Sequence, residues 1–268
     1  MERILILGAS GLVGRAVSKE LENTYEVYGT YGNHPIDLTH SINFDMASGP
    51  HITKVLNQVK PTKVVYCLRG EYDAQLELLN QLVDYLWPID GRLYFCSTAN
   101  VFDGDATKPH SKNDIPLADS DYGQFKIACE KLLINHLNDK GIILRLPMVW
   151  GKDSARFKSL IDLLDNRGRV DVYTNLYINN QIDVMLAQQI VHIIRHDLKG
   201  IYHLGSSDLI SHSEFVKTVV NQLGYLDVSY NEDPPSVEKS YLAVLPTHGD
   251  LPKEYDLSNE LVIRYLTD

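Results

Sequence analysis

Two hydroxyl residues and a tyrosine–lysine pair are the side chains of this sequence best suited to catalysis. Ser97 and Thr98 close an apolar run that starts at Arg92, and Tyr122 and Lys126 stand at the start of a long helical pattern. Their spacing of four residues puts Tyr122 and Lys126 on one face of a helix. These residue types, brought together, can transfer a proton at a carbonyl group.

A glycine-rich turn near the N-terminus offers a place for a dinucleotide. Gly8–Gly14 (GASGLVG) follows the apolar run Ile4–Leu7 and opens a helical pattern. Glycines let the backbone turn tightly and approach a pyrophosphate, and the N–H groups of a helix N-terminus attract phosphate. The alternative is a βα turn without a ligand. We expect this turn to bind NAD(P) through Gly8, Ser10, Gly11, Leu12 and Val13.

A nicotinamide ring beside Tyr122 would let this residue act as an acid or base. A free phenol has a pKa near ~10 and exchanges protons poorly at neutral pH. The Lys126 ammonium and the positive ring of an oxidised nicotinamide would both lower that pKa. Tyr122 then exchanges a proton with the substrate oxygen, which the Thr98 hydroxyl holds, while hydride moves at the adjacent carbon. The structural alternative is a half-buried tyrosine, a solvated lysine and a strand-end cap.

The end of the second predicted strand, residues 25–30, bears on the choice between NAD and NADP. NAD-specific sites place a carboxylate there to bind the ribose 2′-hydroxyl. The stretch Thr30–His34 contains none, so nothing there repels a 2′-phosphate and NADP is favoured, with NAD left open. Thr30, Asn33 and His34 could donate hydrogen bonds to that phosphate, or they are ordinary loop residues.

Short apolar runs alternate with helical patterns through the first half of the chain. The runs predict strands at 4–7, 25–30, 63–68, 92–97 and 141–146, and the periodicity predicts helices at 12–21, 52–59, 74–86 and 122–137. This alternation is typical of an α/β fold with a doubly wound parallel sheet of the Rossmann type. Ser97 and Thr98 would then stand at the carboxyl edge of the sheet, where ligands of such folds bind.

The character of the sequence changes after Trp150. We expect residues 1–150 to form the NAD(P)-binding domain and 151–268 a smaller substrate-binding lobe, with 180–196 packing back on the first domain. The second part predicts helices at 156–164, 182–194 and 211–223 and a strand at 200–204. Such a lobe would cover the carboxyl edge of the sheet.

Charge and composition exclude several classes of protein. The formal net charge is −10, and nucleic-acid binding needs clustered Lys and Arg, so no nucleic-acid partner is expected. No apolar run is long enough for a membrane span or a secretory signal, which favours a cytoplasmic protein without a membrane partner. Cys67, Cys96 and Cys129 form no CxxC pair and no HExxH occurs, so no metal site is expected.

Four segments together resemble the extended short-chain dehydrogenase/reductases, and within them the dTDP-4-dehydrorhamnose reductases. They are Ser97–Gly104 (STANVFDG), Tyr122–Lys126 (YGQFK), Leu144–Gly151 (LRLPMVWG) and Gly200–Gly205 (GIYHLG). The similarity runs over nearly the whole chain. The chain departs from the reductase pattern at three places: Ala99 replaces an Asp, Tyr66–Arg69 replaces an Ala-rich stretch, and Leu245 replaces an Arg.

The resemblance implies a role for each matching residue. Gly11, Leu12 and Val13 would contact the cofactor pyrophosphate, Asp45 and Met46 would lie near the adenine, and Leu68 and Arg69 would lie along the cofactor. Thr98, Tyr122 and Lys126 would be catalytic, and Ala99, Asn100, Tyr122 and Trp150 would lie beside the substrate. The phosphates of that substrate are expected to meet Lys152, Arg156 or Lys158, unless these are solvated surface cations.

The activity implied is an NAD(P)H-dependent reduction of a 4-keto-sugar nucleotide, with the tyrosine as proton donor. Its partner would be a small-molecule nucleotide sugar, and a homodimer is compatible with this reading. Two alternatives stay open. One is an NAD-dependent epimerase or dehydratase of the same superfamily, and the other is a non-catalytic NADP-binding regulatory subunit, as the β subunit of methionine adenosyltransferase is.

Overall fold

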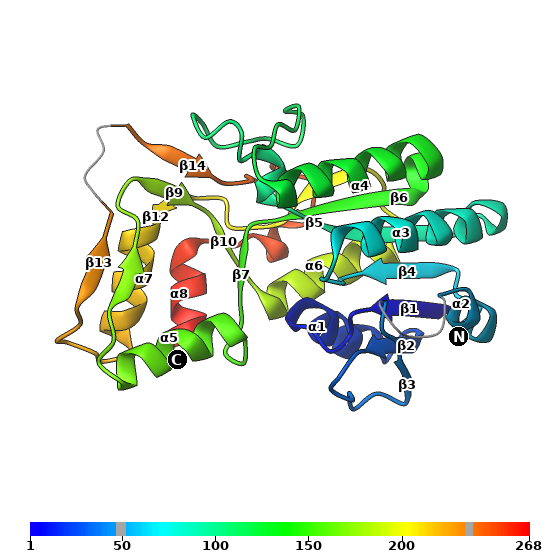
Figure 1. Cartoon of the computed structure of the whole chain (residues 1–268), viewed down its shortest axis with the longest axis horizontal. Coiled ribbons are helices and arrows are strands. Elements are labelled where there is room, and N and C mark those ends of the chain that lie inside the picture. The colour runs from blue at the N-terminus through cyan, green and yellow to red at the C-terminus, as the bar shows by residue number, and fades with distance from the viewer. Residues whose placement is uncertain (47–51, 234–237) are drawn as a thin grey trace.

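A seven-stranded parallel sheet with strand order β11-β6-β5-β4-β1-β2-β3 dominates the computed structural model (Figure 1). The structure describes residues 1–46, 52–233 and 238–268. The strands are β1 (Arg3–Leu7), β2 (Glu26–Tyr31), β3 (His40–Asn43), β4 (Lys63–Tyr66), β5 (Arg92–Thr98), β6 (Gly141–Leu146) and β11 (Ile201–His203). The expected doubly wound parallel sheet is confirmed, and β3 is an additional edge strand that was not predicted.

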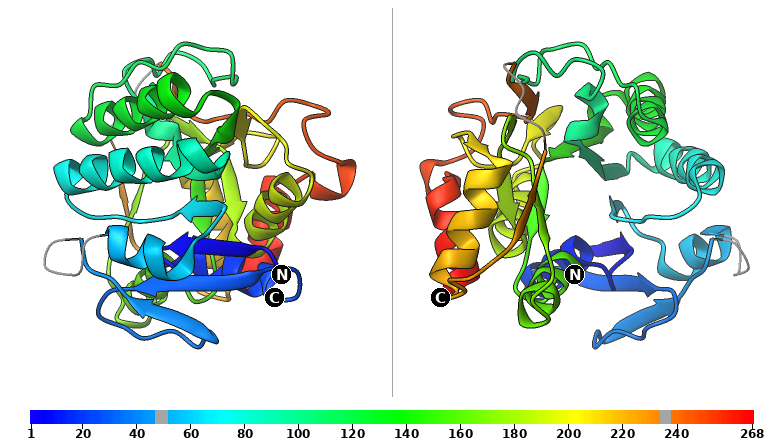
Figure 2. Two further views of the ribbon diagram at one scale, coloured as in Figure 1. Left: turned by 90° about the vertical axis from the view of Figure 1, so that its right-hand side faces the viewer. Right: turned by 60° about the vertical axis from the view of Figure 1, so that its left-hand side comes forward.

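Helices cover both faces of this sheet (Figure 2). They are α1 (Leu12–Leu21) and α6 (Asp183–Arg195) on one face and α2 (Ile52–Val59), α3 (Tyr72–Leu86) and α4 (Asp121–Leu137) on the other. Ile4 and Ile6 of β1 belong to the core under α1 and α6, while Leu5 and Leu7 belong to the core under α2, α3 and α4. Both faces of β1 are therefore buried, which explains its unbroken apolar run.

The strand order reverses beside β1. The sheet continues from β1 through β4 in one direction and through β2 in the other. In open α/β sheets, ligands bind outside the carboxyl ends of the strands at such a switch point. The glycine-rich turn that follows β1 lies at this point.

A second group of elements packs around its own apolar core. Its helices are α5 (Ala155–Asp165), α7 (His212–Gln222) and α8 (Asn259–Thr267). Its small sheets pair β7 (Met148–Trp150) with β10 (Asn180–Ile182), β8 (Val170–Val172) with β13 (Tyr230–Glu232), and β9 (Leu176–Ile178) with β12 (Ile210–Ser211) and β14 (Ser240–Leu242). Short 3₁₀ turns are η1 (Trp87–Ile89), η2 (Ala99–Phe102), η3 (Asn138–Lys140) and η4 (Lys253–Tyr255). We keep residue 150 as the proposed boundary, because Trp150, Phe157, Phe215 and Val262 share this separate core.

No helix within the described ranges is both long and apolar enough to cross a membrane.

A buried ion pair ties β6 to α4. The Arg145 guanidinium donates to both carboxylate oxygens of Glu130, with Nη2 and Oε2 2.7 Å apart, and each residue is 2% exposed. The Ser97 hydroxyl donates to Glu130 Oε1 at 2.5 Å. Because Ser97 immediately precedes Thr98, this ion pair also fixes the end of β5.

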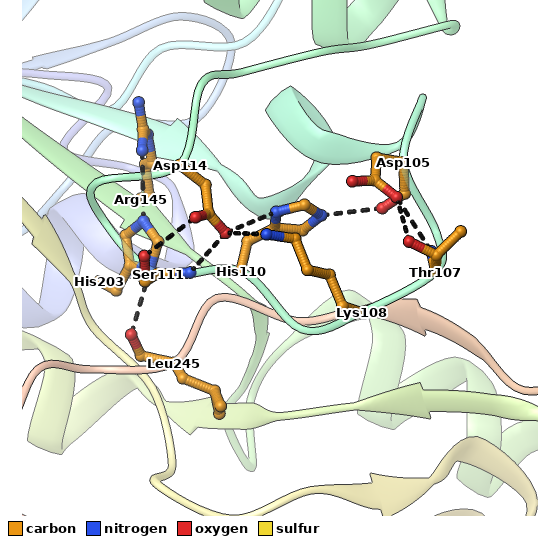
Figure 3. A network of polar contacts seen from close by, with 9 residues as sticks. All are labelled: Asp105, Thr107, Lys108, His110, Ser111, Asp114, Arg145, His203 and Leu245. Carbon is orange, nitrogen blue, oxygen red and sulfur yellow. Dashed lines mark hydrogen bonds and ion pairs between the residues drawn. The ribbon is translucent and has the colours of Figure 1, made fainter.

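His203 of β11 lies against the same arginine (Figure 3). Its Nδ1 is 3.2 Å from the Leu245 carbonyl oxygen, which can only accept, so we place the ring proton on Nδ1. Its Nε2 then accepts from Arg145 Nη1, 3.3 Å away. Burial, followed by the Arg145 charge, lowers the pKa of His203 to about 3. The folded protein thus keeps this imidazole neutral.

Acid is expected to destabilise the fold through His203. An unfolded histidine titrates near ~6.5, whereas His203 in the folded protein takes a proton only near pH 3. Stability present above pH ~6.5 is therefore lost as the pH falls, by up to about 1.4 kcal/mol per pH unit from this group. His203→Gln should flatten the decline in unfolding free energy between pH ~6 and ~4 in urea titrations. The exposed His34→Gln is the matched control, and equal slopes in both variants would contradict the assignment.

Candidate active site

The glycine-rich turn is shaped by close backbone contacts. Gly8 has a φ of 84°, a backbone conformation that residues other than glycine rarely adopt. A Cβ at Gly14 would stand 2.3 Å from the Gly8 carbonyl oxygen, so only glycine lets α1 start this close to the turn. The Thr30 hydroxyl accepts the Gly8 N–H at 2.9 Å, and the Thr30 carbonyl accepts the Ala9 N–H at 2.9 Å. The turn is therefore held from both sides.

The N-terminus of α1 is left open to an anion. Its N-cap residue, Gly11, has no side chain to cap the first turn, whereas serine hydroxyls cap four other helices. These serines are Ser120 of α4, Ser154 of α5, Ser211 of α7 and Ser258 of α8. Orphan N–H groups at the positive end of a helix dipole suit a pyrophosphate. The residues present therefore fit a dinucleotide.

Other predicted cofactor residues surround this turn. A Cβ at Gly8 would lie 3.0 Å from the Cys67 carbonyl oxygen, so the segment after β4, which carries Leu68 and Arg69, runs beside the turn. Met46 packs against the next residue, since a Cβ at Gly70 would be 2.8 Å from the Met46 Cε. Gly8, Leu68 and Met46 thus come together at the sheet edge.

Two predicted residues behave differently from the rest of this set. Thr30 is 1% exposed, and its hydroxyl already accepts a hydrogen bond from the Gly8 N–H, so this residue holds the turn. Its contact with a 2′-phosphate stays a prediction. Asp45 is exposed next to Met46, and its place near an adenine likewise stays a prediction.

Thr98 and Tyr122 meet at the carboxyl end of β5. Thr98 is the last residue of that strand and is 8% exposed. Burial raises the pKa of Tyr122, while the neighbouring Thr98 hydroxyl and the charge of Arg69 act to lower it. The net direction is upward, so the phenol holds its proton at neutral pH and can donate it. Thr98 and Arg69 are therefore the neighbours that favour the phenolate form of Tyr122.

Lys126 lies deeper than Tyr122 on the same helix. It is 4% exposed, and its Nζ donates to the Cys96 carbonyl oxygen at 3.0 Å and stands 5.9 Å from the centre of the Tyr122 ring. The alternative of a solvated lysine is therefore wrong. Burial lowers the pKa of Lys126, which is the expected result for an ammonium with few compensating charges.

Three residues that we did not single out from the sequence position Tyr122. The Asp103 carboxylate accepts the Asp119 N–H at 2.7 Å and bonds the hydroxyl of Ser120, the N-cap of α4. A Cβ at Gly123 would stand 2.3 Å from the Asn100 carbonyl oxygen, so this glycine lets α4 pack directly on η2. Asp103 lies inside the motif quoted above, but its role depends on a contact with a segment that comes later in the chain.

The predicted substrate residues differ in how much surface they offer. Ala99 is 4% exposed and starts η2. Asn100 is partly exposed, and its Oδ1 accepts from the Thr98 hydroxyl at 3.1 Å. Trp150 is 3% exposed, and its Nε1 donates to Asn180 Oδ1 at 2.9 Å. The centre of its indole lies 5.3 Å from the centre of the Phe215 ring, and both belong to the core of the second group of elements. Trp150 therefore presents little of its surface to a substrate.

The family model described as RmlD substrate binding domain matches residues 1–260. The dTDP-4-keto-6-deoxy-D-glucose reductase of Streptomyces niveus is 28% identical over 215 residues, which cover 75% of this chain and 72% of the relative. Methionine adenosyltransferase 2 subunit beta of Xenopus tropicalis is 23% identical over 235 residues, which cover 79% of this chain and 69% of the relative.

Solved structures with the same fold include proteins that hold either dinucleotide. A dTDP-4-dehydrorhamnose reductase of Clostridium acetobutylicum has a TM-score of 0.80 at 21% identity, covering 98% of each chain. The dTDP-4-dehydrorhamnose reductase of Bacillus anthracis, in complex with NADP, has a TM-score of 0.75 at 21% identity, covering 98% of this chain and 97% of the other. WbmH of Bordetella bronchiseptica, in complex with NAD⁺, has a TM-score of 0.77 at 18% identity, covering 92% and 89%.

Proposed function

The chain belongs to the RmlD substrate binding domain family, among the extended short-chain dehydrogenase/reductases, and on that premise we propose that it reduces the keto group of a 4-keto-sugar nucleotide with NADPH. The observation that carries the proposal is the meeting of Thr98 and Tyr122 at the end of β5, where Gly123 lets α4 pack directly on η2. This meeting occurs at the same sheet edge as the open N-terminus of α1. A proton donor and a dinucleotide site at one edge are what a carbonyl reduction needs.

Each side chain has a distinct task in this proposal. Tyr122 donates its phenolic proton to the keto oxygen, and its raised pKa keeps that proton in place until it is needed. The Thr98 hydroxyl orients the same oxygen by a hydrogen bond. Arg69 offsets part of the charge on the Tyr122 oxygen after the proton has left. Lys126, whose Nζ donates to the Cys96 carbonyl oxygen, would bind the ribose of the cofactor.

The cofactor would be held by the first turn of α1. The N–H groups of Leu12 and Val13 lie at this turn and would meet the pyrophosphate. We propose NADPH over NADH because the stretch Tyr31–His34 after β2 contains no carboxylate. A carboxylate at this place would repel the 2′-phosphate of NADPH. When bound, NADPH supplies the hydride that the protein itself lacks.

Turnover with a defined keto sugar tests the proposal. We expect the purified protein to oxidise NADPH when dTDP-4-keto-6-deoxyglucose is added, and to oxidise NADH at least ~10-fold less efficiently as judged by kcat/KM. A panel with UDP- and GDP-linked 4-keto sugars tests substrates with a different nucleotide base. No oxidation of either dinucleotide with any member of the panel would contradict a reductase.

Two other functions remain as candidates within the same superfamily. An NAD-dependent epimerase or dehydratase would retain NAD through gel filtration and convert a nucleotide sugar without net oxidation of added NADPH. The match to methionine adenosyltransferase 2 subunit beta favours a non-catalytic role as the next candidate. Such a subunit would bind NADP without turnover and would co-purify with a partner enzyme.

A further inference from the structure

Two cysteines lie in contact at the carboxyl edge of the sheet. The pairing of β4 with β5 extends to Tyr66 opposite Phe95, so Cys67 and Cys96 are the next pair along the two segments. Both side chains belong to the core under α1 and α6, and their Sγ atoms are 3.5 Å apart. Both are free cysteines in this structure. Two thiols thus face each other beside the proposed dinucleotide site.

The backbone geometry allows a bond between these two sulfurs. Neighbouring strands of a sheet lie about 4.8 Å apart, and disulfides usually join residues whose Cα atoms are about 4.4–6.8 Å apart. A disulfide bond is about 2.0 Å long, so the two Sγ atoms must come closer by roughly 1.5 Å. Rotation of the side chains with a small shift of the two strand ends can supply a movement of this size.

A cation beside the pair favours the thiolate, which is the reactive form of cysteine. The Lys126 Nζ donates to the Cys96 carbonyl oxygen at 3.0 Å. The hydrogen bond with Cys67 and the Lys126 charge lower the pKa of Cys96, against the opposing effect of burial. Cys67 is partly exposed whereas Cys96 is 9% exposed, so a small oxidant reaches the pair from the side of Cys67.

The third cysteine of the chain does not share these features. Cys129 of α4 is 1% exposed, and burial raises the pKa of its thiol to about 12. It belongs to the core under α2, α3 and α4, on the opposite face of the sheet from the other two thiols. Cys129 is therefore an internal control for the reactivity of the pair.

We propose that Cys67 and Cys96 form a redox-active dithiol, which a hydroperoxide closes to a disulfide with loss of affinity for the dinucleotide. The Cys96 thiolate attacks one peroxide oxygen, which breaks the O–O bond, leaves a sulfenic acid on Cys96 and releases hydroxide. The Cys67 sulfur then attacks the Cys96 sulfur, and the Cys67 proton leaves with the sulfenic hydroxyl as water. Two thiols lose two electrons in total, and hydrogen peroxide is reduced to two molecules of water.

The loss of affinity follows from what surrounds the two thiols. The Cys67 N–H donates to the Leu7 carbonyl oxygen at 2.9 Å, and the Cys67 carbonyl oxygen lies 3.0 Å from the position of a Cβ at Gly8. A shift of Cys67 toward Cys96 therefore moves backbone that packs against the glycine-rich turn. This loss rests on the proposed function, which places a dinucleotide at that turn, whereas formation of the disulfide does not.

Peptide mapping of peroxide-treated protein tests the proposal. Reduced protein is treated with hydrogen peroxide, the remaining thiols are alkylated, and the digest is analysed by mass spectrometry without reduction. We expect a Cys67–Cys96 cross-linked peptide, an intact mass lower by about 2 Da before alkylation, and reversal by dithiothreitol. Cys129 should be recovered in its alkylated form. The Kd of NADP in calorimetry should rise about 10-fold or more on oxidation and recover on reduction.

Cys67→Ser and Cys129→Ser are the matched variants. Cys67→Ser should form no cross-link, its Cys96 sulfenic acid should be trapped by dimedone, and peroxide should change its Kd for NADP by less than about twofold. Cys129→Ser should form the cross-link and lose affinity for NADP as the wild-type protein does. The peptide map of the wild-type protein decides the question even where a variant fails to fold.

The outcomes separate this inference from the proposed function. Wild-type protein in which Cys67 and Cys96 stay reduced, or are oxidised without a cross-link between them, would overturn the inference. An unchanged Kd for NADP in fully cross-linked protein would overturn it as well. Reduced protein that binds neither NADP nor NAD would contradict the proposed function, and a Cys67–Cys96 cross-link in that protein would still support the redox-active pair.

Discussion

Tyr122→Phe is expected to lower kcat by about 100-fold or more while the Kd of NADPH stays within about twofold. The substitution removes only the hydroxyl that meets Thr98 at the end of β5. The ring can keep its packing against the cluster that includes Phe125, so the fold and the cofactor site should persist. The measurements are steady-state kinetics with the keto sugar and fluorescence titration of NADPH.

The matched control for this variant is Tyr72→Phe. The Tyr72 ring lies 6.3 Å from the Tyr122 ring and stacks on Phe125, and the residue is 40% exposed. Removing its hydroxyl should change kcat by less than about twofold, because surface substitutions usually have small effects. Turnover of Tyr122→Phe at the wild-type level would remove the tyrosine from the mechanism.

Glu130→Gln is expected to cost about 3–5 kcal/mol of unfolding free energy. The amide keeps the shape of the carboxylate but leaves the Arg145 charge buried without its counter-ion. One acceptor oxygen becomes an amide NH₂, so Ser97 and Arg145 share the single oxygen that remains, the end of β5 is held less firmly, and kcat should fall as well. For a chain of this size the loss corresponds to a Tm lower by roughly 6–20 °C in calorimetry.

Glu232→Gln is the same substitution in an exposed ion pair. Glu232 accepts from Lys217 at 2.5 Å, with 47% of its side chain exposed, and breaking such a pair should cost no more than about 1 kcal/mol. Equal losses of stability in the two variants would contradict the importance assigned to burial at Glu130.

The sheet could be predicted from local patterns because its strands are buried on both faces. The run Ile4–Leu7 is apolar throughout, and it proved to be the central strand β1. The edge strand His40–Asn43 escaped prediction since Ile42 is its one apolar residue. The helix Asn259–Thr267 carries an N-cap at Ser258 and apolar residues at helical spacing, so its signal was present and was overlooked.

The candidate site could be predicted only as far as its motifs are continuous in sequence. Tyr122 and Lys126 share one helix face, and the order of motifs along the chain located Thr98. Asp103 and Gly123 were missed because both act at the contact between the start of α4 and η2. This contact joins segments that are separate in sequence, so no local pattern predicts it.

The direct test of the central claim is to follow deuterium from NADPH labelled at the transferable position of its nicotinamide ring. The protein is incubated with dTDP-4-keto-6-deoxyglucose, or with whichever keto sugar of the panel gives turnover, and the sugar is examined by mass spectrometry and NMR. We predict one deuterium at the former keto carbon for each NADPH oxidised, and transfer slowed about 100-fold or more in Tyr122→Phe. A sugar that is altered without acquiring deuterium, or NADPH oxidised without any labelled sugar, would contradict hydride transfer to the keto group.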